Sequence, residues 1–496
     1  MTVADRPAGS PAGAGPADLD ALLGEPGPAA DGVLRWTTVA APDLDPIALF
    51  AAAREIDLEA ALWLQPADGF ALVGIGRAWS VERSGLDRFA ASSDDWRALL
   101  AGRAGGRLGA RAGGRLGVPA GALTRGVGPV LLGGLGFTGA VPAPGDAWAP
   151  FGAASLVLPT LVHSRTPGGA FLTAALAGSF DGAAPRDVAR RWERLEARAR
   201  ELSPAPGAVV ARPADAPLAT AAEQPDRAAW DRLVGLFAGA VGRGRIDKVV
   251  LGCRVALRSP RELDPVNALR RLAAAGPEST TFAFVRGGVT FLGATPERLV
   301  RTEGRAFRTV AIAGSAARGA DDAEDARLAA ALLASDKERE EHAVVVEMLR
   351  DALGPLVARL AIAPEPAVLR LRHVQHLVTP VEGTLRDETG LLALAGRLHP
   401  TPAVGGEPRE AALDLIAEHE GFERGWYAGP VGWLGADGDG EMMVALRCGL
   451  VAGQAATLFA GCGIVADSDP AREWEESRIK LRPVASALGR LEDGGR

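Results

Sequence analysis

The chain has 496 residues, 48% hydrophobic and 23% charged, which is enough length to bury one large core or two ordinary ones. Its 54 Lys and Arg against 61 Asp and Glu give a net charge of −7, which argues against nucleic-acid binding because phosphate neutralisation needs a basic surface. Its three cysteines, Cys253, Cys448 and Cys462, form no CxxC pair, and no apolar run approaches the roughly 18 residues of a membrane span. We therefore expect a cytoplasmic protein with reduced thiols and no membrane partner.

The first part of the chain alternates between biased and regular segments. Residues 1–30 are rich in Pro, Ala and Gly and predict a disordered leader, with ordered structure beginning near Leu34. A duplicated octapeptide occupies 103–118; it is either a basic loop that contacts an anion or, as we favour, loop padding. A Pro/Ala linker at 201–217 then separates a first part, 31–215, from a second part, 216–490.

The second part mixes strand and helix signals without regular alternation. Tight glycine turns such as Arg286-Gly287-Gly288 favour antiparallel pairing. This pattern predicts a large α+β domain with its helices packed outside. The predicted strands are 248–257, 281–285, 289–292, 431–434 and 442–451, and the predicted helices are 219–241, 322–353, 409–420 and 470–490.

Two charged residues on the predicted strands attract attention. Lys248 begins a strand in a chain whose positive charge is nearly all arginine, and lysine, unlike arginine, can lose its proton when desolvated. Glu297 follows Pro296 at the end of a hairpin strand. Taken alone, each is more simply interpreted as a solvated residue at a strand end or turn.

Two predicted helices carry acidic stripes. Glu338 and Glu341 share one face of the helix that ends at Gly354-Pro355, and a carboxylate beside its apolar run would need a cation or a metal. Ser468-Asp469-Pro470 is a good start for the last helix, on which Glu473, Glu476 and Lys480 form one stripe. A solvated acidic face is the alternative for the first helix, and on the last helix Glu476 and Lys480 taken alone would be a weak surface ion pair.

Backbone and side-chain donors lie near these helices. Gly461 and Gly463, just before the last helix, could offer N–H groups to an anion or merely form a tight turn. Arg447 lies in an apolar strand and needs a carboxylate for its planar fork. His399 could be a ligand or base, although a structural histidine before a proline is the safer interpretation.

Each motif is weak alone, but their order and wording together, from about 220 to 486, resemble the chorismate-utilising enzymes. That family contains isochorismate synthase, salicylate synthase, anthranilate synthase component I and aminodeoxychorismate synthase. The run from 423 to 480 is the most specific part, and segments in 120–170 resemble the family more loosely. The resemblance implies an α+β fold with a two-sheet antiparallel core wrapped by helices, chorismate as substrate, and Mg²⁺ as cofactor.

The resemblance also implies roles for individual residues. Lys248 matches the family's general base, which takes a proton from water, and Glu297 matches its general acid. Glu341 and Glu476 match the magnesium carboxylates. The substrate-binding candidates are Gly314, Ser315, His399, Ala403, Tyr427, Arg447, Gly461 and Lys480.

Within the family the resemblance is closest to isochorismate synthases of menaquinone or siderophore biosynthesis. Ala313 stands where aminodeoxychorismate synthases carry a nucleophilic lysine, and no LLES signature of anthranilate synthase is present. Ala403 favours isochorismate synthase, because the resemblance places a threonine at this position in salicylate synthases. Tyr427 does not separate the two, because salicylate synthases also have tyrosine there. We expect a monomeric isochorismate synthase, with salicylate synthase or a non-catalytic chorismate-binding module as alternatives.

Overall fold

The computed structural model describes residues 34–56, 59–102, 125–177, 185–204, 216–370, 374–387 and 389–491. The expected leader 1–30 and the repeat 103–118 lie outside the described residues. Ordered structure begins with strand β1 at Leu34, as the sequence predicts. Among the helices of the described ranges, none combines the length and apolar composition that a membrane crossing requires.

Within these ranges a first sheet contains thirteen strands, antiparallel except for the short β9–β23 pair. Its order is β1-β8-β7-β3-β2-β11-β12-β21-β22-β10-β9-β23, with β18 beside β10, so both parts of the chain contribute to one sheet. The strands are β1 Leu34–Ala40, β2 Ala60–Gln65, β3 Phe70–Ile75, β7 Leu161–Thr166, β8 Gly169–Ala177, β9 Pro217–Gln224, β10 Lys248–Arg258, β11 Thr280–Arg286, β12 Val289–Thr295, β18 Gly406–Glu407, β21 Cys448–Ala452, β22 Ala455–Ile464 and β23 Arg490–Leu491.

A second, antiparallel sheet of ten strands faces the first, again counted over the described ranges. Its order is β15-β17-β14-β13-β20-β19-β5-β6-β4, with β16 beside β17. The strands are β4 Trp79–Glu82, β5 Val130–Leu135, β6 Ala154–Leu158, β13 Arg298–Glu303, β14 Ala306–Ala317, β15 Val357–Ile362, β16 Ala367–Arg370, β17 Val374–Leu385, β19 Pro430–Gly435 and β20 Gly440–Val444.

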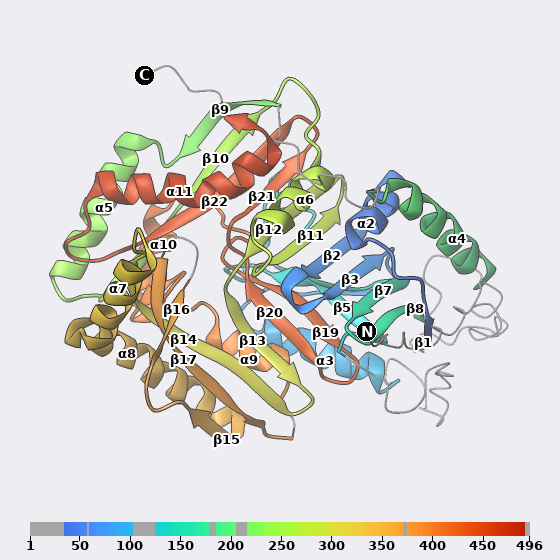
Figure 1. Ribbon diagram of the computed structural model, residues 1–496, viewed down its shortest axis with the longest axis horizontal. Coiled ribbons are helices and arrows are strands. Elements are labelled where there is room, and N and C mark those ends of the chain that lie inside the picture. Colours follow the sequence, from blue (N-terminus) through green and yellow to red (C-terminus); the bar gives the residue numbers. More distant parts are fainter. Residues whose placement is uncertain are drawn as a thin grey trace, which may run out of the picture.

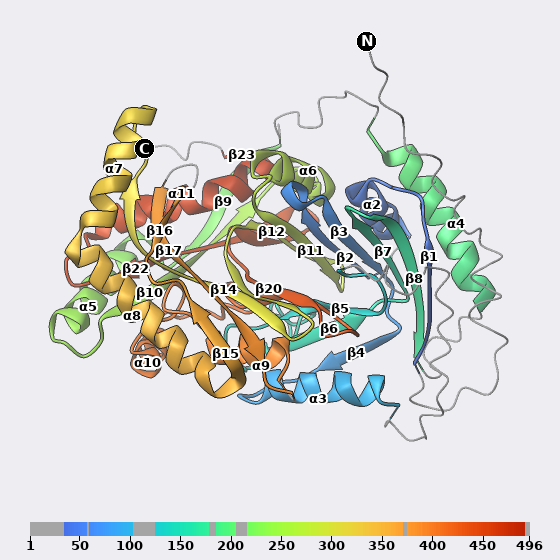
Figure 2. The ribbon, with the colours of Figure 1, turned by 60° about the horizontal axis from the view of Figure 1, so that its bottom comes forward.

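Helices cover the outer faces of both sheets (Figures 1 and 2). Helices α2, α6 and α11 pack on the first sheet, with α4 against α2, while α8 and α9 pack on the second, with α3 against α9. Their bounds are α2 Pro46–Glu55, α3 Arg88–Leu100, α4 Pro185–Leu202, α5 Arg227–Gly242, α6 Pro265–Ala275, α7 Asp322–Ala334, α8 Asp336–Leu353, α9 Leu391–Leu398, α10 Arg409–His419 and α11 Pro470–Leu488; the 3₁₀ turns are Pro66–Asp68 and Gly354–Leu356.

A cluster of aromatic side chains from distant parts of the chain is fully buried in the core. The rings of Phe151, Phe291 and Trp426 lie 5.3–6.2 Å apart between centroids, and Trp148 packs on the same cluster. Large rings bury much apolar area each, so this cluster contributes strongly to holding the chain together. The α+β fold with a two-sheet antiparallel core and outer helices is thus confirmed.

Three predicted elements are corrected. The helix predicted at 219–241 is strand β9 followed by α5, because Pro225 disfavours helical backbone at Gln224 and the segment pairs with β10. The helix predicted at 322–353 breaks at Ser335, whose hydroxyl caps α8 by accepting the Glu338 amide. The strand predicted at 442–451 divides into β20 and β21, which belong to different sheets.

Candidate active site

Lys248 is the first residue of β10, opposite Glu407 of β18. Its half-buried side chain runs across the neighbouring strand β22, where Gly463 leaves room for it. A Cβ atom at position 463 would lie 2.5 Å from Lys248 Cε, which is closer than carbon atoms approach. Gly463 therefore leaves the space that the Lys248 side chain occupies on this face of the sheet.

Glu297 lies where the chain crosses from β12 of the first sheet to β13 of the second. Burial raises the pKa of its carboxyl, and the positive charges of Lys248, Arg447 and Lys480 act in the opposite direction. The charges of three cations from three separate segments therefore act on one carboxyl group. This convergence brings together four of the residues that the sequence singled out.

Arg447 occupies the neighbouring crossing, between β20 and β21, rather than the interior of a strand as predicted. Its backbone has a φ of +47°, a left-handed conformation that is uncommon for a residue with a side chain. Burial lowers the pKa of its guanidinium, while Tyr427, Glu476 and Glu297 act against this. Arg447 therefore interacts electrostatically with Tyr427, with Glu297 and with Glu476 of α11.

Helix α11 contributes further charged groups to the candidate site. The Asp469 side chain caps it by accepting the Arg472 amide at 2.9 Å, with Pro470 in its first turn, as the sequence predicts. Lys480 Nζ lies 2.6 Å from Glu476 Oε1 and donates to the Gly461 carbonyl at 2.8 Å. Lys480 therefore links Glu476 of α11 to the backbone of β22.

Gly461 and Gly463 lie within strand β22, opposite Gly252 and Val250, so they form neither the predicted anion loop nor the turn to α11, which follows at residues 465–468. The missing side chain at Gly461 makes room for Tyr427, whose hydroxyl oxygen would lie 2.8 Å from a Cβ there. Tyr427 is 3% exposed and stacks on Phe459 at 5.4 Å. The Tyr427 hydroxyl thus lies on the same face of the first sheet as the Lys248 side chain.

A donor cluster that could hold a metal lies at the start of α11. Ligand atoms of Cys462, Glu473 and Glu476 lie within 4.8 Å of one another, with Cys462 buried and Glu476 exposed. Burial raises the pKa of the Cys462 thiol, so the sulfur stays protonated and the two carboxylates remain as the donors suited to Mg²⁺. Glu473, one helical turn before Glu476, was not among the predicted site residues.

Gly314 and Ser315 of β14 lie against Glu338 at the start of α8. Gly314 has a φ of +73°, and the Ser315 amide donates to a Glu338 carboxylate oxygen at 2.9 Å. Glu341 follows one turn later with an exposed side chain, and it does not join the Cys462 cluster in the described chain. Its role as a metal ligand stays a prediction.

His376 on β17 is a site residue that the sequence did not reveal. Its Nδ1 lies 2.8 Å from the Ser315 hydroxyl, and burial lowers its pKa, helped by the charges of Lys248 and Lys480. His376 therefore favours the neutral ring. The sequence held a signal for Glu338 and Glu473, each one turn before a predicted ligand, but none for His376 in an ordinary strand.

His399 lies among aromatic side chains. It is 5% exposed, its ring packs against Phe89 and Phe137, and its Nε2 lies 3.0 Å from the Phe137 carbonyl. Burial lowers its pKa to about 3, which keeps it neutral. This is the environment of a structural histidine, the safer interpretation of the sequence, while Ala403 in the following loop is exposed.

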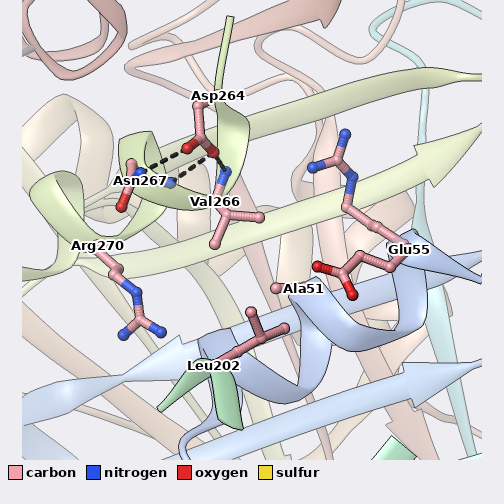
Figure 3. A pocket seen from close by; sticks show the side chains of 8 residues that line it. Ala51, Glu55, Leu202, Asp264, Val266, Asn267 and Arg270 are labelled. Carbon is pink, nitrogen blue, oxygen red and sulfur yellow. Dashed lines mark hydrogen bonds between the residues drawn. The ribbon is translucent and has the colours of Figure 1, made fainter. Parts of the chain in front are cut away.

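A separate cavity of about 440 Å³ lies between α2, α6 and the end of α4 (Figure 3). Its charged groups are largely paired: Glu55 binds Arg198, Arg270 binds Asp45, and Asp264 accepts the amides of Val266 and Asn267 at the start of α6. None of the predicted site residues lines it. The convergence around Glu297 is therefore the stronger candidate site.

Known proteins resemble the chain over most of its length. Residues 29–489 match the family model described as chorismate binding enzyme. The salicylate biosynthesis isochorismate synthase of Pseudomonas aeruginosa is 38% identical over 467 residues, covering 91% of this chain and 90% of the relative. The isochorismate synthase MenF of Bacillus subtilis is 37% identical over 367 residues, covering 73% of this chain and 75% of the MenF chain.

Solved structures show the same architecture. MenF, the menaquinone-specific isochorismate synthase of Escherichia coli, superposes with a TM-score of 0.74 at 27% identity over 95% of this chain and 98% of that one. The two-sheet core, the site at the sheet crossings and the family match thus lead to one conclusion: the chain belongs to the family of chorismate-binding enzymes.

Proposed function

We propose that the protein is a Mg²⁺-dependent isochorismate synthase of the cytoplasm, which converts chorismate to isochorismate. The reaction adds water at C2 and expels the hydroxyl at C4, so one group must take a proton and another must give one. The observation that carries the proposal is that the charges of Lys248, Arg447 and Lys480 all act on the half-buried carboxyl of Glu297. Relatives that carry the name isochorismate synthase over most of their length support it.

Lys248 is the base and Glu297 is the acid of this proposal. To act as the base, Lys248 must first lose its own proton, and it then takes a proton from the water that attacks C2. Glu297 gives its proton to the C4 hydroxyl, which leaves as water, so that atoms and charge balance. The raised pKa of Glu297 supports this role, because a general acid must hold its proton near neutral pH.

The cations of the site suit a substrate with two carboxylates. Arg447 presents a planar fork that can bind one carboxylate through two hydrogen bonds. Lys480 is already paired with Glu476, so it compensates charge on the helix side of the pocket. Tyr427 and Ser315 offer hydroxyl groups. Binding at these groups would orient the ring between Lys248 and Glu297.

The carboxylates of α11 fit the expected magnesium ion. Glu476 and Glu473 would hold it on this side, with Glu341 of α8 as the further predicted ligand, because Mg²⁺ prefers oxygen donors. When bound, the ion supplies positive charge for a carboxylate of the substrate. It would also neutralise the acidic stripe, which otherwise repels a dianion.

The decisive experiment incubates the purified protein with chorismate and Mg²⁺ and separates the products by chromatography. We expect isochorismate. Salicylate with pyruvate would instead identify a salicylate synthase, in which pyruvate elimination follows in the same pocket. Chorismate binding without any turnover would identify a binding module and contradict an enzymatic role.

A further inference from the structure

Strand β10, which begins with Lys248, has an interrupted edge. On one side it pairs with β22 from Val249 to Arg258. On the other side β18 pairs only with Lys248 and Val249, and β9 only from Arg254 onward. In the described chain, side chains and a loop rather than a strand bind the backbone between these two pairings.

Two side chains and one loop carbonyl complete that edge. The Gly252 amide donates to Glu420 Oε2 at 2.7 Å, and Arg424 Nη2 donates to the Val250 carbonyl at 2.8 Å. The Val250 amide donates to the Gly405 carbonyl at 2.9 Å. Glu420 and Arg424 thus act on the strand as a neighbouring backbone would.

The same arginine also holds the loop that contains Ala403. Arg424 Nη1 donates to the Val404 carbonyl at 2.8 Å, next to Ala403 in the chain. Arg424 Nε and Nη2 bind the Glu420 carboxylate at 2.6 and 2.5 Å. One planar guanidinium therefore sets the separation between the lysine strand and this loop.

The ion pair lies on the sheet face that carries Lys248. A Cβ atom at Gly252 would lie 2.8 Å from Glu420 Oε2, and residues 248 and 252 point to the same face because side chains alternate along a strand. The Arg424 guanidinium lies 4.2 Å from the centroid of the Phe137 ring and 5.9 Å from that of Tyr427. The pair is thus packed directly beside the site.

This arrangement is costly in free energy. Both side chains are 2% exposed, and a buried ion pair often stabilises a protein no more than apolar residues of similar size would. We propose that Glu420 and Arg424 are positioning residues, which hold Lys248 and the Ala403 loop at the separation that the reaction requires. The role in the reaction rests on the proposed function, whereas the geometric role can be measured without it.

The test is Arg424→Lys, which keeps the charge opposite Glu420 but loses the fork that joins the Val250 and Val404 carbonyls. We expect kcat to fall roughly 10–100-fold, since a small misplacement of reacting groups is that costly, with KM within about threefold. Arg270→Lys is the matched control, because Arg270 has a 9% exposed side chain and binds Asp45 away from the site. We expect it to keep its kcat.

A second readout does not need turnover. The rate of reductive methylation of Lys248, measured by peptide mass spectrometry, should change in Arg424→Lys, while exposed Lys337 serves as reference within the same chain. A wild-type protein inactive on chorismate would contradict the proposed function, but this labelling experiment would still decide the geometric role.

Two results would overturn the inference: normal kcat together with normal Lys248 labelling in Arg424→Lys, or equal losses of kcat in Arg270→Lys. If Arg424→Lys does not fold, Gly252→Ala replaces it, since its methyl group would displace the Glu420 carboxylate. Normal kcat and labelling in that variant would equally reject the positioning role.

Discussion

Glu297 and Arg447 lie on two adjacent, antiparallel crossings between the sheets. The Val444 amide donates to the Glu297 carbonyl at 2.9 Å, and the Ala294 amide donates to the Arg447 carbonyl at 3.1 Å. The two side chains therefore sit on one hydrogen-bonded unit, in which the arginine's charge acts on the carboxyl. The backbone itself thus holds the proposed proton donor and the proposed anion-binding arginine at a fixed relation to each other.

Replacing the proposed base should remove turnover but not substrate binding. Lys248→Ala should lower kcat by roughly 10²–10⁴-fold, the usual contribution of a general base. Chorismate binding, measured by calorimetry, should persist because Arg447 and Lys480 remain. Lys337→Ala on the exposed start of α8 is the control and should keep full activity. Near-normal turnover of Lys248→Ala would show that another group takes the proton.

The protonation of Glu297 should appear in the pH dependence of stability. Because its pKa is raised on folding, its stabilising contribution is complete at low pH and is lost as the pH rises through the folded-state pKa. Glu297→Gln cannot ionise and escapes that loss. In urea unfolding without ligand, its stability relative to wild type should therefore be higher at pH 8 than at pH 4. A constant difference between the two pH values would mean that the carboxyl is not perturbed.

Removing a carboxylate from α11 should weaken metal binding. Glu476→Gln should reduce Mg²⁺ affinity by about tenfold or more, as measured by calorimetric titration in the presence of chorismate. Glu341→Gln tests the predicted ligand on α8 in the same way. Glu475→Gln changes an exposed neighbour outside the donor cluster and should bind Mg²⁺ as wild type does. Unchanged affinity in Glu341→Gln would remove that residue from the metal site.

A buried charge network next to the Glu297 crossing should govern stability. Glu441 is fully buried and binds Arg298 at 2.5 Å and Arg125 at 2.6 Å. Glu441→Leu would leave both guanidinium groups without their buried partner, and we expect a loss of about 3 kcal/mol or more in the free energy of unfolding. Urea denaturation measures it. The surface pair Arg301–Glu303 is the control, and Glu303→Leu should cost less than about 1 kcal/mol.

Local signals predicted several elements correctly. The end of α8 at Gly354-Pro355 and the start of α11 at Asp469-Pro470 follow from cap chemistry, which acts within one helical turn. The β11–β12 hairpin follows from its glycine turn. The acidic stripes on both helices were visible from their spacing alone, and so were Lys248 and Glu297 as unusual strand-end charges.

By itself, the sequence determined the family and the fold class and predicted the site residues, because short motifs and the period of each element carry this information. Only the tertiary structure decided that 442–451 crosses between sheets at Arg447, that Gly461 and Gly463 lie within a paired strand, and that His376 faces Ser315. The physical reason is that sheet membership and pocket-facing contacts depend on hydrogen bonds between segments up to hundreds of residues apart. No local pattern of side chains contains that information.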